Sequence, residues 1–183
     1  MMYNEEGLMK VEPPDPGAWR PVDLPGGDLP AMVKWAMSDA EVEAAYDIRR
    51  EVFVREQGYT EAQEFDSADA KALHLICQLV PGCATTPGAA RHLGTARLLV
   101  DASSDPILAY VSRLCVLPFA RRMGLGRAIV GFVVDTAREL GCARVRAGAQ
   151  VTALDFWASL GFRPTGEGYM DFHIPHEWTE LTF

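Results

Sequence analysis

The stretch LCVLPFARRMGLGRAI, residues 114–129, joins a strand-like run to a helix-like run. Gly124 and Gly126 stand where the helix should begin, with three arginines beside them. A helix N-terminus offers unpaired N–H groups and the positive end of the helix dipole, so it attracts anions. Glycine lets a ligand approach the backbone, and guanidinium groups pair well with phosphate oxygens. These residues predict a pyrophosphate site; a plain turn with solvated arginines is the alternative.

Two other phosphate-binding motifs fit this stretch poorly. A Walker A loop needs Lys followed by Ser or Thr after its second glycine, whereas Arg127 and Ala128 follow Gly126 here. A Rossmann loop needs a third glycine three residues later, where this chain has Ile129. The two glycines therefore indicate a different kind of phosphate site.

Length and charge limit the class of protein. The chain has 183 residues, which suits one domain with a sizeable core, and its formal net charge is −8. Because nucleic-acid affinity depends on neutralising phosphates, we expect no nucleic-acid partner. No apolar run is long enough to span a bilayer, and the first residues contain no secretory apolar region. We therefore expect a cytoplasmic protein without a membrane partner.

The cysteine pattern argues against a metal centre. Cys77, Cys83, Cys115 and Cys142 form no CxxC pair, and three of them lie in apolar runs. This arrangement is typical of buried, reduced thiols. We therefore predict no metal site.

Proline and glycine divide the chain into an N-terminal arm, residues 1–29, and one domain, residues 30–183. Because these residues disturb helices and sheet ladders, we expect the arm to form neither. In the domain, hydrophobic periodicity predicts the order β-α-β-β-β-α-β-α-β, a mixed α/β sheet with an antiparallel hairpin at its third and fourth strands. The predicted strands are residues 31–37, 73–80, 91–101, 107–117 and 143–151, with one or two more in 162–174, and the predicted helices are residues 39–57, 125–140 and 152–161.

Capping signals define three helix ends. Ser38 with Glu41 has the capping-box spacing, and so has Thr152 with Asp155. Gly141 stands where the glycine that follows a helix C-terminus belongs.

Two motifs together resemble the GCN5-related N-acetyltransferase (GNAT) family. Its coenzyme A motif, Arg/Gln-x-x-Gly-x-Gly/Ala after Val-x-Pro, is similar to residues 114–129, and its A…FYxxxGF segment is similar to AQVTALDFWASLGF, residues 149–162. The resemblance covers about residues 31–175. It implies one acyl-CoA N-acyltransferase domain with a mixed, mostly antiparallel sheet flanked by helices, whose fourth and fifth strands splay apart.

Shorter segments resemble the ElaA-like branch of this family. They are REVFVREQGY (50–59), FDSADAKALH (65–74), GTARLL (94–99), YVSRLCV (110–116), GAQ (148–150) and HIPH (173–176). The last match is imperfect, because His173 stands where the branch has a glycine.

The resemblance implies acetyl-CoA as the acyl donor. In the family, the pantetheine arm pairs with the open edge of the fourth strand, and the pyrophosphate binds the glycine loop. The positions that would bind the donor are Leu114, Cys115, Val116, Arg121, Arg122, Met123, Gly124, Leu125, Gly126, Arg127, Gln150, Phe156 and Trp157.

The implied reaction is direct transfer in a ternary complex. An amine attacks the thioester carbonyl, a base removes the amine's extra proton, and the coenzyme A thiolate leaves. A backbone N–H of Val116 or Cys115 polarises the carbonyl, and Cys115 needs no nucleophilic role. Trp157 stands where the family often has a tyrosine that protonates the thiolate, which the indole N–H does not do at neutral pH. The thiolate is instead protonated by Tyr169 or by a water, or it leaves without a proton.

In the family, the first helix and the following loop form one wall of the acceptor site. Candidate bases from these segments are Glu56, Asp66 and His74, with Glu64 nearby; a solvated acidic loop and a core histidine are the alternatives. Because a buried arginine needs a partner, we predict that Arg113 bridges to one of these acids. The candidate substrate-binding residues are Phe53, Arg97, Arg113 and His176.

We expect an N-acetyltransferase that acts on a primary amine of a small molecule. The alternatives are an amino-sugar phosphate acceptor, a protein acceptor, and a non-catalytic coenzyme A-binding module. The Glu-Asp pair expected for the amino-sugar phosphate acceptor is replaced by YVSR, residues 110–113. A homodimer is common in the family, so we include one among the expected partners.

Overall fold

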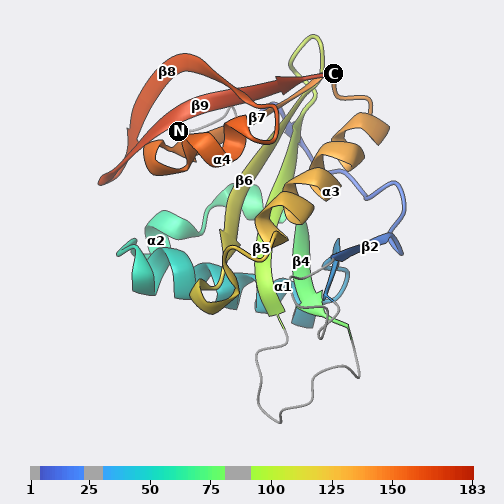
Figure 1. Cartoon of the computed structure of the whole chain (residues 1–183). Helices are drawn as coiled ribbons and strands as arrows, with labels where there is room; N and C mark the ends of the chain where they lie inside the picture. Colours follow the sequence, from blue (N-terminus) through green and yellow to red (C-terminus); the bar gives the residue numbers. More distant parts are fainter. Residues whose placement is uncertain (1–4, 23–30, 81–91) are drawn as a thin grey trace.

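The computed structural model describes residues 5–22, 31–80 and 92–183, so Cys83 lies outside the described residues. Within these ranges one sheet has the strand order β2-β3-β4-β5-β6-β7-β9-β8, and β1 pairs with β5 off this path (Figure 1). The strands are β1 (Leu8–Met9), β2 (Trp19–Val22), β3 (Ala31–Trp35), β4 (Leu73–Leu79), β5 (His92–Asp101), β6 (Leu108–Val116), β7 (Arg144–Gln150), β8 (Arg163–Asp171) and β9 (Ile174–Thr182). The α-helices are α1 (Asp39–Arg49), α2 (Glu61–Glu64), α3 (Leu125–Glu139) and α4 (Leu154–Ala158).

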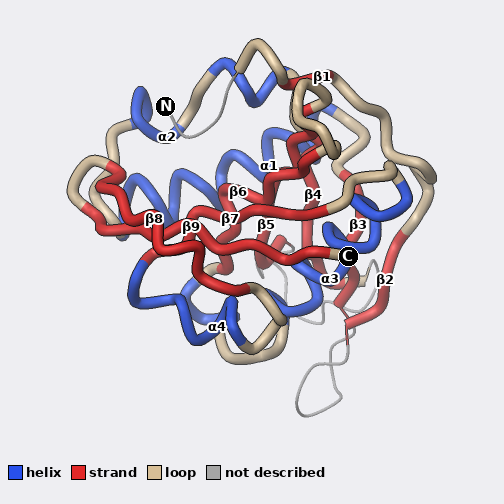
Figure 2. Tube along the Cα trace, turned by 90° about the horizontal axis from the view of Figure 1, so that it is seen from above, coloured by secondary structure: helices blue, strands red, loops and turns tan. Residues whose placement is uncertain are grey.

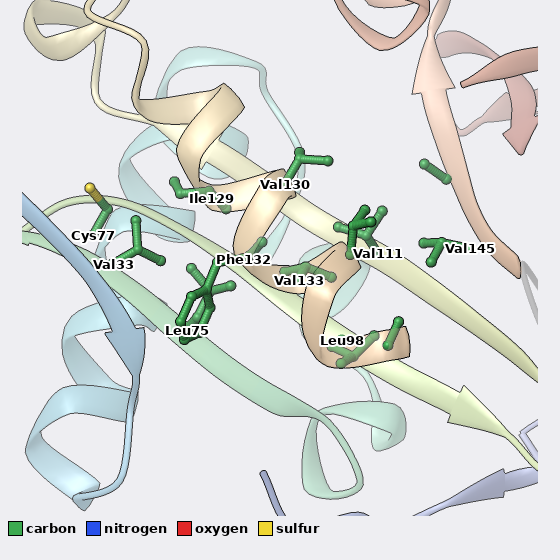
Figure 3. Close-up of a cluster of buried hydrophobic side chains, with 14 of the residues drawn as sticks. Val33, Leu75, Cys77, Leu98, Val111, Ile129, Val130, Phe132, Val133 and Val145 are labelled. Atoms are coloured by element: carbon green, nitrogen blue, oxygen red, sulfur yellow. The ribbon is translucent and has the colours of Figure 1, made fainter. Parts of the chain in front are cut away.

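Helices cover both faces of the sheet (Figure 2). α1 packs on β4, β5 and β6 from one side, and α3 packs on β2 to β7 from the other. Between α3 and the sheet lie the buried side chains of Leu75, Leu98, Val111, Ile129 and Val133 (Figure 3). Burial of this apolar surface is the main favourable contribution to folding, and it holds the N-terminus of α3 in place.

The hairpin predicted at the third and fourth strands is confirmed. β5 and β6 pair antiparallel, and the last predicted segment forms two strands, β8 and β9. The first helix also runs as expected, because α1 continues into a π-helix, Arg50–Glu56, and Gly58 follows with a φ of 80°. The mixed α/β sheet predicted from the sequence is therefore correct.

Two of the three capping predictions are confirmed. The Ser38 side chain accepts a hydrogen bond from the Glu41 N–H, and the Glu41 carboxylate accepts one from the Ser38 N–H. Gly141 has a φ of 77°, and its N–H donates to the Arg138 carbonyl at the end of α3. The predicted cap at Thr152 is wrong: residues 151–153 form a 3₁₀ turn, and α4 begins only at Leu154. Thr152 is therefore inside a turn and cannot adopt the extended conformation of an N-cap.

Two segments of the N-terminal arm form strands, which contradicts the expectation that it joins no ladder. Trp19–Val22 pairs antiparallel with β3, and Leu8–Met9 pairs antiparallel with β5. β2 is the edge strand of the sheet and contains Pro21. Proline lacks only an N–H donor, which an edge strand can spare on its outer side.

β6 and β7 are parallel neighbours that diverge. Their pairing covers only residues 108–111 of β6 and 144–147 of β7, so the C-terminal halves of both strands are not paired with each other. On its other side β6 contains a bulge, because the register with β5 shifts between Thr95 and Arg97. Arg113 lies in this bulge with a φ of 54°. The divergence confirms the predicted splay, and the bulge turns the Arg113 side chain toward α2.

Candidate active site

A cavity lies where β6 and β7 diverge. Its other walls are the end of the first helix and the β8–β9 hairpin. Six aromatic side chains line it, including Phe53 and Tyr59, and three charged side chains reach it: Glu64, Arg113 and Asp171.

The glycine loop begins α3 beside this cavity. Gly124 has a φ of 83° directly before the helix, a conformation that side chains disfavour. An added Cβ at Gly124 would meet no heavy atom within 4 Å, so space above the loop is open. The first helical hydrogen bond runs from the Ala128 N–H to the Gly124 carbonyl, which leaves the N–H groups of residues 125–127 without intrahelical partners. These groups can bind an anion.

Gly126 has a different role from Gly124. A Cβ at this position would lie 3.3 Å from Cζ of Phe156, so the glycine lets α4 pack closely against α3. Trp157 of α4 is buried, and its ring lies 5.0 Å from that of Phe162. Both Phe156 and Trp157 also line the cavity, as expected for residues beside the acyl donor.

The three arginines of the loop are exposed, and two of them, Arg121 and Arg127, already have partners. Arg121 forms an ion pair with Glu56, 2.7 Å from Nη1 to Oε1, and its Nε donates to the Val116 carbonyl. Arg127 donates to the hydroxyl of Ser159 at 3.0 Å. The hydrogen bond from Arg121 lowers the pKa of Glu56, which makes this carboxylate a weaker base.

Cys115 of β6 is a buried, free thiol, as predicted. The Cys115 side chain is buried, and this burial raises the pKa of its thiol well above the usual range. A thiol that stays protonated is a poor nucleophile. Leu114 lines the cavity, as does Gln150 of β7, whose amide donates to Oε1 of Gln57 at 2.9 Å.

Six charged side chains, three of them buried and three partly buried, form a network beside the cavity, and we call it the charge network. Its guanidinium groups belong to Arg49, Arg97 and Arg113, and its carboxylates to Glu64, Asp66 and Asp69. These residues come from α1, α2, the 3₁₀ turn at residues 67–70 with its cap, β5 and β6. Buried charges are tolerated when they are paired in this way.

The geometry of the charge network is close and mostly bidentate. Arg97, fully buried, donates to Asp66 Oδ1 at 2.6 Å and to Asp69 Oδ1 at 2.7 Å. Arg49 contacts Glu64 at 2.7 Å through Nε and Asp69 at 2.7 Å through Nη1. Arg113 approaches Glu64 Oε2 at 3.0 Å and Asp66 Oδ2 at 3.3 Å. The predicted bridge from Arg113 to an acidic residue is therefore confirmed.

Burial and charge pairing act in opposite directions on the carboxylates of the charge network. Burial alone disfavours ionisation of Asp69, but its hydrogen bond from Arg49 and the charge of Arg97 hold its pKa well below the usual range. At Asp66, the Arg97 hydrogen bond likewise outweighs burial and lowers the pKa. Burial raises the pKa of Glu64 although two arginines contact it. The two aspartates are therefore poor proton acceptors.

Two histidines that the sequence singled out have different environments. Nε2 of His74 lies 3.0 Å from the Asp69 carbonyl, while its Nδ1 is buried without a hydrogen-bond partner, and burial lowers the pKa of its ring. His176 lines the cavity, and its Nδ1 lies 3.0 Å from the Ile174 carbonyl. Because a carbonyl only accepts hydrogen bonds, Nδ1 of His176 carries a proton, and in the neutral ring Nε2 has the lone pair. Among the described residues, Nε2 of His176 has no hydrogen-bond partner.

The structure thus divides the predicted site residues into two groups. Phe53, Arg113 and His176 reach the cavity together with Leu114, Gln150, Phe156 and Trp157. The predicted residues that do not line it are Glu56, Asp66, His74 and Arg97, together with the donor-binding positions 115–116 and 121–127. Sequence reasoning missed Tyr59 and Asp171, whose only signal was their position near the ElaA-like segments 50–59 and 173–176.

The described residues contain no group of three or more His, Cys, Asp or Glu side chains that could hold a metal ion. No helix among them is long and apolar enough to cross a membrane.

Comparisons with known proteins agree with this geometry. The model of the acetyltransferase (GNAT) family matches residues 42–162. A "putative acetyltransferase" of Bacillus subtilis (strain 168) is 32% identical over 145 residues, which cover 79% of this chain and 91% of that protein. The crystal structure of an acyl-CoA N-acyltransferase from Pseudomonas aeruginosa has a TM-score of 0.67 and 25% identity, and covers 84% of this chain and 99% of the other.

Escherichia coli ElaA has the same fold, with a TM-score of 0.65 and 22% identity over 81% of this chain and 99% of its own. The family match covers more than half of the chain and includes both the glycine loop and α4. The chain therefore belongs to the GNAT acetyltransferase family and is an acyl-CoA-dependent acyltransferase.

Proposed function

We propose that this protein transfers an acetyl group from acetyl-CoA to the primary amine of a small molecule, directly and in a ternary complex. The observation that carries the proposal is the cavity itself, which joins the open edge of β6 to Nε2 of His176, an atom without a hydrogen-bond partner among the described residues. Acetyl-CoA supplies an activated acyl group when it is bound. The open space above Gly124 and the unpaired N–H groups of residues 125–127 fit its pyrophosphate.

His176 is the base in this proposal. Its Nδ1–H donates to the Ile174 carbonyl, which orients the ring, so Nε2 can accept the proton that the attacking amine loses. Tyr169 stacks on this ring at 5.4 Å, and its hydroxyl lies over Gly148, where an added Cβ would overlap it. Glu56, Asp66 and His74, the sequence candidates, are each engaged elsewhere.

Binding of the donor is tested by thermal unfolding with acetyl-CoA, coenzyme A and ATP. A ligand at 100 times its dissociation constant stabilises the folded state by about 2.7 kcal/mol, which gives a readable rise in melting temperature. We expect a rise with both coenzyme A forms and none with ATP. No rise with any of the three would show that the glycines only form a turn.

Catalysis is tested by following thiol release from acetyl-CoA with a panel of primary amines. The His176→Gln variant should lower kcat by about 10²-fold or more, because a general base contributes that much, while the acetyl-CoA melting shift stays unchanged. His173→Gln is the matched control, because His173 is on the same hairpin and contacts only the Gln57 carbonyl by hydrogen bond. Binding without turnover of any amine would favour a non-catalytic coenzyme A-binding module.

A further inference from the structure

The charged groups at the cavity do not balance. In the charge network three guanidinium groups face three carboxylates, so Glu64 and Arg113, which also line the cavity, offset each other. Asp171 lies outside this network. Its carboxylate accepts a long hydrogen bond of 3.4 Å from the Tyr59 hydroxyl, and no arginine, lysine or histidine among the described residues forms an ion pair with it. The cavity therefore has one carboxylate without a counter-charge.

The surroundings of Asp171 suit a cation. Tyr59, Tyr110, Trp178 and Phe53 line the same cavity, and the faces of aromatic rings attract positive charge. Burial and the nearby Asp171 carboxylate raise the pKa of Tyr59, so the phenol stays a neutral donor. An anionic acceptor such as a sugar phosphate would meet an unbalanced carboxylate here, and Arg113, the cation in the cavity wall, already contacts Glu64 and Asp66.

The hairpin sets the distance between Asp171 and the proposed base. Asp171 on β8 pairs with Ile174 on β9, and His176 is two residues farther along β9 on the same face. Such diagonal neighbours in an antiparallel pair are about 7–8 Å apart. An acceptor that reaches both side chains therefore has its two polar ends separated by roughly this distance.

We propose that the acceptor is a diamine or a related dication: one nitrogen attacks the thioester beside His176, and the second stays protonated on Asp171. This inference rests on the proposed function, because it assigns the acceptor of the same site. Asp171 makes no covalent contact and takes no proton; it selects the acceptor by charge and by distance. Charge-assisted contacts of this kind are stronger than neutral ones.

The experiment measures amine binding by calorimetry to the protein saturated with coenzyme A. The probes are cadaverine, a five-carbon diamine whose extended length matches the spacing, and n-hexylamine, which replaces one of its ammonium groups by a methyl group. Wild-type protein should bind cadaverine about tenfold more tightly, as expected for a hydrogen-bonded contact to a charged group. Ethylenediamine is too short to reach both side chains and should lose this advantage.

Two variants localise the effect. Asp171→Asn keeps the size of the side chain and should bring cadaverine to the affinity of n-hexylamine, without changing the affinity of n-hexylamine. Glu167→Gln removes a negative charge from the same strand, outside the cavity, and should keep the wild-type ratio. Three outcomes would overturn the proposal. Wild-type protein could bind the two amines with equal affinity, it could bind neither, or Asp171→Asn could lower the affinity for both amines equally. Failure to bind coenzyme A would instead overturn the proposed function.

Discussion

In the proposed function, the two sides of the cavity bind their ligands by different physical means. On the donor side, the groups that we propose face acetyl-CoA are main-chain N–H groups at residues 125–127 and the edge of β6, and the nearby arginines are exposed. On the acceptor side, six charged side chains from distant parts of the chain, three buried and three partly buried, support the wall. The donor side is thus built from a short local motif, whereas the acceptor side depends on tertiary packing.

This difference has consequences for stability. The exposed pair of Arg121 and Glu56 is hydrated, and such pairs contribute between about 0 and 1 kcal/mol. Removing one member of a buried pair leaves an uncompensated charge and costs about 3–5 kcal/mol. Substitutions on the two sides should therefore separate effects on folding from effects on ligand binding.

The largest effect is expected for Arg97→Met. Arg97 is fully buried and contacts Asp66, Asp69 and the Ser112 hydroxyl. Methionine would leave Asp66 without its closest counter-charge and Asp69 paired with Arg49 alone. We expect the free energy of unfolding to fall by about 3–5 kcal/mol, measured by urea denaturation.

The matched control for Arg97→Met is Arg55→Met. The Arg55 side chain is 72% exposed and pairs with Glu51 one helical turn away. This substitution should change the free energy of unfolding by no more than about 0.5 kcal/mol. Equal effects of the two variants would contradict the distinction between the buried and the exposed side.

The same distinction explains what could be predicted from the sequence. The glycine loop, the splay of β6 and β7 and the order of the strands were all predictable, because local spacing and a family motif encode them. The pairing of Arg113 with an acid was also predictable, since a charge in an apolar run needs a partner. The sequence does not show which acid Arg113 contacts, nor that Arg97 supports the wall without reaching the cavity. Both depend on the β6 bulge and the β5 register, which no local sequence pattern indicates.

The proposed base, His176, was not predictable for a related reason. His74 and His176 both occur in ElaA-like segments, and nothing in their neighbours distinguishes them. Both side chains are buried, and only the fold places the first beside Asp69 and the second at the cavity. The N-terminal arm was predicted to join no sheet because of its prolines. That prediction was wrong, because an edge strand such as β2 tolerates Pro21.

A smaller effect is expected from acid titration of the charge network. Asp69 has a lowered pKa when folded and a pKa near 3.9 when unfolded, so the unfolded state binds its proton first as the pH falls. The stabilisation is present above about pH 5 and is lost below that, with a slope of up to about 1.4 kcal/mol per pH unit for each such group. Chemical denaturation at pH 5, 4, 3 and 2 should show this decline, and Asp69→Asn should make it shallower. An unchanged slope in the variant would contradict the pairing of Asp69.

On the donor side, Gly124→Ala tests the loop. The space around Gly124 is open, so an added methyl group clashes with nothing, but alanine is strained at a φ of 83° by about 1–2 kcal/mol. We expect this loss in the free energy of unfolding together with weaker binding of acetyl-CoA, measured by calorimetry. Gly126→Ala is the comparison: its Cβ meets Phe156 at 3.3 Å, and it should alter the packing of α4 more than the start of α3.

The smallest effect is expected for Glu56→Gln, which tests whether the donor side depends on an ion pair as the acceptor side does. The Glu56 side chain is 38% exposed and holds Arg121, so its loss should change the free energy of unfolding by less than about 1 kcal/mol. The same substitution releases the Arg121 guanidinium for a phosphate group, so acetyl-CoA should bind more tightly, by no more than about fivefold. Calorimetric titration at two salt concentrations checks this, because the gain should shrink as salt screens the exposed charge. Weaker binding in the variant would mean that Glu56 orients Arg121 toward the donor instead of competing for it. In that case the donor side, too, would depend on a contact between distant segments, since Glu56 ends the first helix and Arg121 lies in the loop before α3.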